Sequence, residues 1–340
     1  MYDCEFVFWN CEDRRVEIRK GRIFCDNSRV IFEECDVKPR YIACPAFINS
    51  HTHLGDSIAK DPAYSGIEVV MPGGYKFRML ERYSEECEDA MRESILFSAL
   101  SGTLRIYDFR EGGVEGVEML KRADKAKICK VLGRPDRDLK GAEEVIRIAD
   151  GFGISSVRDT GQEIAERLAE LARKYRKLFF IHAGEVDSKD VEGAIELRPD
   201  ALIHMNMASK EQIRKVMDEG IPVVSCIRSN MFFNVVNAEN YRRFIEYGIE
   251  EGKWFLGTDN VMLCSPNMLE EMHFASYLLR EDEGIFRAAT SGIVDGLELG
   301  AVVFHRRMNF SRVRNPLSTI VRRGCIEDIE CVLPGKVVFA

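Results

Sequence analysis

The sequence predicts an α/β chain that folds as a (β/α)8 TIM barrel, with a small flanking β-domain built from both termini. The chain has 340 residues, is 46% hydrophobic and contains no Gly/Ser/Pro-rich linker, which indicates one large domain with a small appendage. From Pro45 onward, short apolar runs alternate with longer amphipathic stretches, as in repeated βα units. An open doubly wound sheet would usually carry a Gly-rich phosphate turn after its first strand, and none follows here. We expect the barrel at 45–300 and the composite β-domain at 1–44 and 301–340.

Eight apolar runs have the length and composition of barrel strands. They lie at 46–51, 103–109, 127–132, 153–157, 177–182, 201–205, 221–226 and 253–259. Helical stretches separate them, and the clearest is 162–175. In that stretch Ile164, Leu168, Leu171 and Tyr175 recur at spacings of three and four, while charged residues fill the other face.

Both ends of the chain have a different character. Residues 1–44 and 301–340 contain short apolar runs that resemble the strands of hairpins. Their polar turns lie at 11–14, 26–28 and 334–335. We expect these runs to pair into one small sheet beside the barrel.

Charge and cysteine content exclude several classes of protein. The net charge of −8 and a pI near 5.5 argue against a surface that binds nucleic acid. The eleven cysteines are odd in number and include no CxxC pair, which favours free thiols over a disulfide framework. The first residues are acidic, and no apolar run approaches the roughly 18 residues needed to span a bilayer. We therefore expect a cytoplasmic protein without a membrane partner.

Histidines at predicted strand ends point to a metal site. His51 and His53 lie two residues apart at the end of the first strand, so both imidazoles leave the same face. Two more of the six histidines, His182 and His204, also end predicted strands, and Asp259 ends the eighth. The carboxyl ends of barrel strands converge, which would bring these side chains together. Imidazoles and a carboxylate suit one divalent metal with room for water.

Glu185 and His204 are the candidates for proton transfer and substrate activation. Glu185 follows His182 by three residues, which is far enough past the strand end to face the cavity. The alternative is that Glu185 is a solvated acid of a loop. His204 would polarise the substrate or serve as a further nitrogen ligand, and Asp259 is expected to act in catalysis as well as in metal binding.

The motifs PAFINSHTHL, HAGE, IHMN, CIRSN and LGTDN, in this order, resemble the metal-dependent amidohydrolase superfamily. They are most similar to its aminohydrolase branch of cytosine, guanine and adenosine-type deaminases and triazine hydrolases. The resemblance extends over nearly the whole chain. It implies a single zinc or iron ion at the positions of His51, His53, His182 and Asp259. It also implies that Glu185 and His204 match the catalytic pair.

Some positions depart from the superfamily pattern. The predicted fourth strand offers Ser155 and Ser156 but no lysine, whereas two-metal relatives such as dihydroorotase and urease use a carbamylated lysine there. One metal ion per chain is therefore favoured. Zn2+ is the expected ion, and Fe2+ is the alternative. Ile227 replaces the usual proline before the SN motif. These departures leave the substrate less defined than the reaction.

Basic residues near the predicted barrel mouth suggest an anionic substrate. Four arginines follow predicted strand ends, and a lysine lies in the segment 55–83, which is long enough to form a lid. They are Arg110, Arg134, Arg158, Arg228 and Lys76. Guanidinium groups would bind a carboxylate or phosphate by paired hydrogen bonds. The alternative is that the arginines pair with the adjacent acids Glu111, Asp136 and Asp159.

Three functions fit these residues. The first is hydrolytic deamination of an aminated heterocycle that bears an anionic group. The second is hydrolytic opening of a cyclic amide, as in imidazolonepropionase. The third is a barrel without catalysis that serves as a binding protein, which the retained set of candidate metal and catalytic residues disfavours. A small molecule is the expected partner, and the sequence is compatible with a homo-oligomer.

Overall fold

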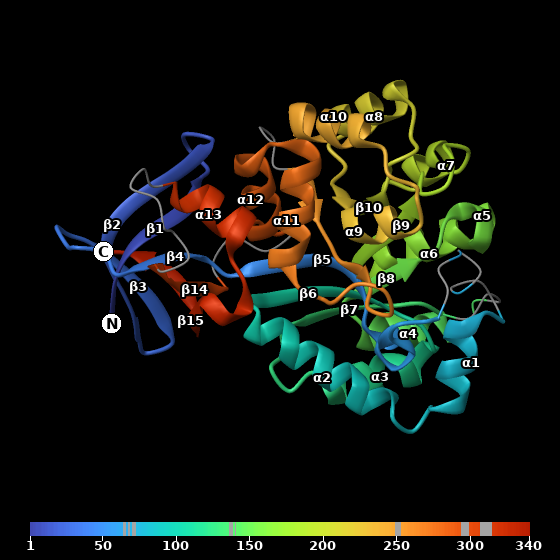
Figure 1. Ribbon diagram of the computed structural model, residues 1–340. Coiled ribbons are helices and arrows are strands. Elements are labelled where there is room, and N and C mark those ends of the chain that lie inside the picture. Colours follow the sequence, from blue (N-terminus) through green and yellow to red (C-terminus); the bar gives the residue numbers. More distant parts are fainter. Residues whose placement is uncertain are drawn as a thin grey trace.

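Two sheets organise the chain. The computed structural model describes residues 1–63, 66, 69, 73–135, 139, 141–248, 253–293, 299–306 and 315–340. A sheet of nine strands with helices around it forms the larger part, and a sheet of seven strands from both chain ends forms the smaller part (Figure 1). The predicted fold class, a barrel with a flanking β-structure, is confirmed.

The barrel strands follow the order β12-β11-β10-β9-β8-β7-β6-β5-β13, and every neighbouring pair is parallel. Their bounds are β5 Phe47–His53, β6 Thr103–Arg110, β7 Cys129–Gly133, β8 Gly151–Ile154, β9 Leu178–Ala183, β10 Ala201–His204, β11 Val223–Ser225, β12 Trp254–Leu256 and β13 Asp259–Asn260. Because β12 pairs with β11 and β13 pairs with β5, the two short strands together act as the eighth strand and close the barrel.

The eighth strand is interrupted where one continuous strand was predicted. A Cβ atom at Gly257 would lie 2.7 Å from the backbone nitrogen of His51, so a side chain has no room there. Beside it, the amide of Thr258 donates to Oδ1 of Asn49 (3.0 Å), and Nδ2 of Asn49 donates to Oγ1 of Thr258 (2.8 Å). This close approach brings Asp259 beside the end of β5.

Helices surround the strands (Figure 1). Their bounds are η1 Leu54–Ala59, α1 Tyr75–Arg82, α2 Cys87–Leu100, α3 Gly113–Ala123, α4 Ala142–Ile148, α5 Val157–Thr160, α6 Gln162–Tyr175, α7 Val191–Glu196, α8 Lys210–Asp218, α9 Ile227–Phe232, α10 Ala238–Gly248, α11 Met268–Leu279 and α12 Asp282–Thr290. Helix α6 has the bounds predicted from its periodicity. It buries Ala165, Leu168, Ala169 and Ala172 against the barrel, whereas charged residues cover its outer face.

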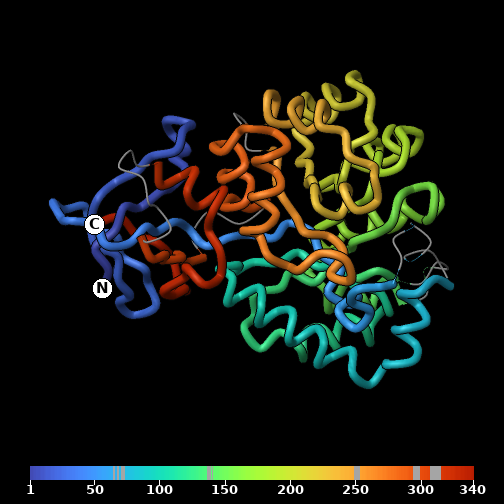
Figure 2. Tube along the Cα trace, viewed as in Figure 1, coloured from blue at the N-terminus to red at the C-terminus, as the bar shows by residue number. Residues whose placement is uncertain are grey.

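The smaller sheet joins the two ends of the chain, as the neighbouring blue and red segments in Figure 2 show. Its order is β15-β14-β4-β1-β2-β3-β16. The bounds are β1 Tyr2–Asn10, β2 Arg15–Asp26, β3 Arg29–Glu34, β4 Tyr41–Pro45, β14 Gly300–His305, β15 Ile329–Pro334 and β16 Lys336–Phe339. Phe6 stacks on Phe8 and Phe32 in the core of this sheet, with ring centroids 5.6 and 5.0 Å apart. The predicted turns at 11–14 and 26–28 therefore join paired strands, whereas the turn at 334–335 joins β15 and β16, which pair with β14 and β3 and not with each other.

Helix α13, Pro316–Arg323, lies in the C-terminal stretch where only strands were expected. Asn315 caps it by accepting a hydrogen bond from the amide of Ser318 (3.0 Å), and Pro316 begins the first turn. The helix contacts α11 and α12 of the barrel as well as β1. The helix was not predicted because its buried residues Thr319, Ile320 and Val321 are β-branched, and β-branched residues favour strands. The division of the chain at residues 45 and 300 stays a prediction.

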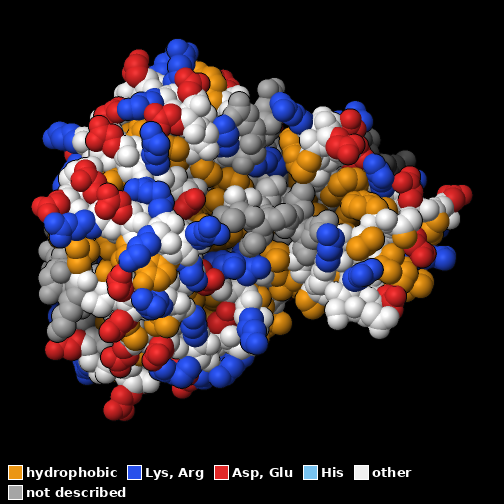
Figure 3. Space-filling view, turned by 180° about the vertical axis from the view of Figure 1, so that it is seen from behind, with side chains coloured by type: hydrophobic (Ala, Val, Ile, Leu, Met, Phe, Trp, Pro, Cys, Tyr) orange, Lys and Arg blue, Asp and Glu red, His pale blue; other side chains and the backbone are white. Residues whose placement is uncertain are grey.

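The surface and the thiols agree with the composition. Acidic and basic side chains are interspersed over the face shown in Figure 3. All eleven cysteines are free, and five of them are buried: Cys4, Cys44, Cys87, Cys226 and Cys264. Within the described residues, the helices are too short or too polar to cross a bilayer.

Candidate active site

His51 and His53 lie at the end of β5 and point the same way. Between them, Thr52 faces β6 and donates from Oγ1 to Oδ1 of Asp108 (3.0 Å). His51 is fully buried, and its ring contacts that of His53 at a centroid distance of 4.9 Å. Phe109 lies edge-on to His51 at 4.5 Å and forms an apolar floor under the two imidazoles.

Four side chains meet at the carboxyl ends of four strands. The ligand atoms of His51, His182, His204 and Asp259 all lie within 4.8 Å of one another. Nε2 of His51 is 3.1 Å from Oδ1 of Asp259 and 3.2 Å from Nε2 of His182. Nδ1 of His51 and Nδ1 of His204 are buried without a partner among the described residues. Three imidazoles and one carboxylate converging at this distance fit a divalent metal ion.

His53 lies at the edge of this cluster. Its Nε2 is 3.5 Å from Oδ1 of Asp259, and its ring stacks on that of His182 at 5.5 Å. Three members of the predicted ligand set therefore belong to the four-residue cluster, and the fourth, His53, adjoins it. His204 takes the remaining place in the cluster.

Burial gives these residues the charge states that a metal needs. It lowers the pKa of the His53 imidazole to about 3, and it also lowers those of His51 and His182. Burial alone would raise the pKa of Asp259, but the hydrogen bond with His51 and the nearby imidazoles hold it well below its usual range. Neutral imidazoles thus surround an ionised carboxylate.

Hydrogen bonds outside the cluster orient its members. Nδ1 of His182 donates to the carbonyl of Ile154 (3.0 Å), which leaves Nε2 free to bind a metal. Oγ of Ser229, in α9, donates to Oδ2 of Asp259 (2.6 Å). Sequence reasoning missed the role of Ser229, although its position in the CIRSN motif could have indicated it.

Two residues of the cluster have a left-handed backbone. The φ angle is 77° at His204 and 60° at Asp259. For residues other than glycine this conformation costs on the order of 1–3 kcal/mol, and it persists when the surrounding structure imposes it. In both cases the chain turns at the strand end and directs the side chain into the cluster.

Glu185 lies beside the cluster on the loop after β9. Its Oε2 is 3.7 Å from Nε2 of His204, and its side chain is one-third exposed. Burial raises the pKa of Glu185, although the neighbouring His204 imidazole opposes the shift. Nδ2 of Asn206 donates to the backbone carbonyl of Glu185 (3.0 Å) and so holds the loop. A carboxyl group in this environment is suited to accept and return a proton.

A sequence model described as "Amidohydrolase family" matches residues 42–294, which include the whole cluster. This chain belongs to the amidohydrolase family. A relative from Archaeoglobus fulgidus, named "Putative aminohydrolase", is 44% identical over 306 residues and covers 89% of each chain. Family membership makes this amidohydrolase a metal-dependent hydrolytic enzyme that acts on C–N bonds.

Solved structures share the fold of this amidohydrolase. A triazine hydrolase variant has a TM-score of 0.76 at 15% identity, covering 98% of this chain and 93% of its own. An adenosine deaminase from Xanthomonas campestris with bound zinc has a TM-score of 0.72 at 14% identity, covering 98% of this chain and 92% of its own. At these identities the likeness shows the barrel with its flanking sheet.

Arg228 is bound within the protein. Its Nε donates to Oε2 of Glu271 (2.7 Å), its NH1 donates to Oε2 of Glu270 (2.5 Å), and its NH2 donates to the carbonyl of Ser265 (2.6 Å). The other oxygen of Glu271 accepts from the amide of Ile227 (2.6 Å). The pair fixes the start of α9, the helix that carries Ser229.

We expect Arg228→Met to destabilise this amidohydrolase and to leave KM nearly unchanged. Removing one partner leaves the fully buried carboxylate of Glu271 without its cation, which costs about 3–5 kcal/mol of unfolding free energy. Urea unfolding measures the loss. As a control, Arg158→Met removes a half-exposed side chain that pairs with Asp187 (2.5 Å) and should cost about 0–1 kcal/mol. A raised KM with unchanged stability in Arg228→Met would instead support anion binding.

The other predicted basic residues also have partners. Arg110 is buried, donates from Nε to the carbonyl of Gly116 (3.3 Å) and packs so closely on Gly55 that a Cβ there would lie 1.7 Å from NH1. Arg158 pairs with Asp187 and not with the adjacent Asp159. Asp136, the expected partner of Arg134, lies outside the described residues.

Arg134 and Lys76 share a carboxylate near His53. NH2 of Arg134 donates to Oε1 of Glu111 (3.1 Å), and Nζ of Lys76 donates to the same oxygen (3.0 Å). NH1 of Arg134 also donates to Oγ of Ser155 (3.1 Å). Burial alone would raise the pKa of Glu111, but these two cations and His53 hold it well below its usual range. Sequence reasoning gave Glu111 only the role of a partner for arginine.

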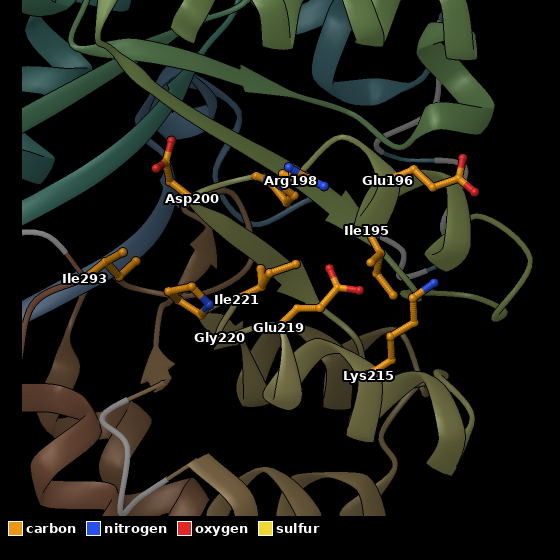
Figure 4. A pocket seen from close by; sticks show the side chains of 11 residues that line it. Ile195, Glu196, Arg198, Asp200, Lys215, Glu219, Gly220, Ile221 and Ile293 are labelled. Atoms are coloured by element: carbon orange, nitrogen blue, oxygen red, sulfur yellow. The ribbon is translucent and has the colours of Figure 1, made fainter.

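A separate hollow of about 850 Å³ lies at the opposite end of the barrel (Figure 4). Asp200 and Ile221, which line it, precede β10 and β11, whereas the metal-binding cluster follows the strands. Acidic and basic side chains, among them Glu196, Arg198 and Lys215, line it together. Catalytic groups in these barrels lie at the carboxyl ends of the strands, so this hollow is not the active site.

Proposed function

We propose that this amidohydrolase removes an amino group from a nitrogen heterocycle by hydrolysis. It would use one divalent metal ion per chain, and Zn2+ is the expected ion. The observation that carries the proposal is the convergence of His51, His182, His204 and Asp259 within 4.8 Å, beside the carboxyl group of Glu185. Deamination is favoured because one solved structure of the same fold is named an adenosine deaminase.

His51, His53, His182 and Asp259 would hold the metal, and His204 would act on the substrate. His204 belongs to the converging set, so a ligand role for His204 is the alternative, and its contact with Glu185 favours the role on the substrate. Nε2 of His53 faces Oδ1 of Asp259 at 3.5 Å, whereas Nε2 of His204 faces Oε2 of Glu185 at 3.7 Å. His204 therefore lies between the metal ligands and the group proposed to move protons.

A divalent metal in such a site supplies Lewis acidity, which activates water at neutral pH. Glu185 would take a proton from the attacking water and give it to the leaving nitrogen, so that ammonia departs. Its raised pKa favours the first step, because burial makes this carboxylate a stronger base toward the water than an exposed carboxylate would be. His204 would donate a hydrogen bond to the substrate, and Asp259 would accept one from the water.

An anionic group on the substrate stays part of the proposal, with Arg134 as the residue that would bind it. The Arg134 side chain is 32% exposed and joins the site through Glu111, which lies 3.7 Å from Nδ1 of His53. Arg158, 47% exposed, is a second candidate. Arg110, Arg228 and Lys76 are buried, and we leave them out of the binding surface.

Ammonia release is the experiment that tests this function. Zinc-loaded protein is incubated with aminated purines, pyrimidines, pterins and triazines, each in a neutral and an anionic form, and metal-depleted protein serves as the control. We expect ammonia from an anionic member of the panel and none from the control. Ammonia from neutral members alone would contradict the anionic substrate. Silence across the panel, together with opening of a cyclic amide such as an imidazolone, would replace deamination by the ring-opening reaction.

A further inference from the structure

A buried group of charged side chains joins helix α1 to the candidate metal site. Lys76, on α1, is 6% exposed, and its Nζ lies 2.9 Å from Oδ1 of Asp56 and 3.0 Å from Oε1 of Glu111. Asp56 is fully buried in η1, three residues past His53, and Glu111 follows β6. We refer to Asp56, Lys76 and Glu111 as the Lys76 cluster.

Glu111 faces the outer nitrogen of His53. Its Oε1 is 3.7 Å from Nδ1 of that ring, and this nitrogen is buried without a hydrogen-bond partner among the described residues. Oε2 of Glu111 is likewise buried and unpartnered within the described parts of the chain. The carboxyl group of Glu111 thus lies beside an unsatisfied nitrogen of His53, and a small rotation of either side chain would bring a carboxylate oxygen to the roughly 3 Å of a hydrogen bond.

The opposite nitrogen of His53 faces the metal-binding cluster. Nε2 lies 3.5 Å from Oδ1 of Asp259, so the ring lies between two carboxylates. A carboxylate that accepts from Nδ1–H keeps the proton on that nitrogen, frees Nε2 for a metal and fixes the plane of the ring. Glu111 has the position that this role requires.

Lys76 connects this arrangement to α1. The helix is also held by apolar contacts, in which Tyr75 and Met79 pack against Ala59, Val69 and Met262. The ammonium group of Lys76 fixes Oε1 of Glu111 at one side, so the carboxylate stays directed at His53. Withdrawal of α1 would leave two buried carboxylates without this cation.

We propose that Glu111 is a positioning residue for His53, and that Lys76 couples retention of the metal to the packing of α1 on the barrel. The inference rests on the proposed function in one respect, because it takes His53 as a metal ligand. It goes beyond that function by giving helix α1 a role in holding the metal.

Zinc affinity in the absence of substrate tests the proposal. Glu111→Gln keeps the size of the side chain but loses its charge, and it should weaken zinc binding by about 10- to 100-fold in competition with a chromophoric chelator at fixed pH. Lys76→Met should weaken binding in the same direction and speed zinc release, and Lys76→Arg should restore part of the affinity. In the double variant, the loss of zinc-binding free energy should be smaller than the sum of the losses in the two single variants, because both changes disrupt one arrangement.

Glu81→Gln is the matched control, since Glu81 is exposed on the same helix. It should bind zinc as tightly as the wild type. Unchanged zinc affinity in Glu111→Gln would overturn the proposal, and so would a Lys76→Met protein that melts earlier without zinc yet binds zinc normally, because Lys76 would then stabilise the fold alone. A wild-type protein that binds no zinc would instead overturn the proposed function on which the inference rests.

Discussion

Replacing His182 with alanine should remove the metal from the protein and abolish hydrolysis. His182 contributes Nε2 to the centre of the cluster, 3.2 Å from Nε2 of His51, and its orientation is fixed by the bond to Ile154. Loss of an outer partner of a ligand typically costs 10- to 100-fold in metal affinity, so loss of the ligand itself should cost more than about 100-fold. Metal content after dialysis and ammonia release measure the two effects.

His305→Ala is the control for this variant. His305 lies in the sheet of the termini, where its Nε2 pairs with Glu330 at 2.6 Å, far from the cluster in the fold. It should retain the metal content and rate of the wild type. A His182→Ala protein that keeps a full equivalent of metal would show that the cluster is not the binding site.

Replacing Glu185 with glutamine should lower kcat by about 10²- to 10⁴-fold, with the metal still bound. This is the contribution expected of a group that transfers a proton in the rate-limiting step. Glutamine fills the same space beside His204 but cannot take up a proton from water. Steady-state kinetics with the substrate found in the ammonia assay give kcat and KM separately.

Glu170→Gln serves as the matched control, because Glu170 is exposed on α6. Its kinetics should equal those of the wild type. A Glu185→Gln protein with normal kcat and a raised KM would assign Glu185 to substrate binding. Loss of metal from this variant would assign it to the metal site.

The barrel could be predicted from the sequence because each strand carries its own signal. The run 177–182 became β9, Leu178–Ala183, and helix 162–175 became α6 with the same bounds. The interruption at Gly257 could not be predicted, because it comes from contact with His51 in a strand that is distant along the chain. Helix α13 was missed for a related reason: its packing on α11 and α12 outweighs the strand propensity of its residues.

The candidate site was predictable to the extent that strand ends converge. This rule is sufficient to place His51, His182, His204 and Asp259 together. The partners of the arginines could not be predicted, because they lie far from the arginines along the chain. Glu271 lies 43 residues from Arg228, and Asp187 lies 29 residues from Arg158. Of the acids named beside the arginines, Glu111 does neutralise part of this charge, but it does so at Arg134 and Lys76.

The pairing of β13 with β5 both closes the barrel and completes the candidate metal site. In that register Asp259 pairs with Thr52 and Asn260 with His53, so the seam between the first and last strands runs between the proposed ligands. An open barrel would have the histidine pair of β5 on one side of the seam and the carboxylate on the other. A metal ion that binds both sides favours the closed form over the open one by mass action. The ion would thus stabilise the closed barrel as well as take part in catalysis. Removal of the ion would weaken the closure of the barrel and disable the catalytic centre together.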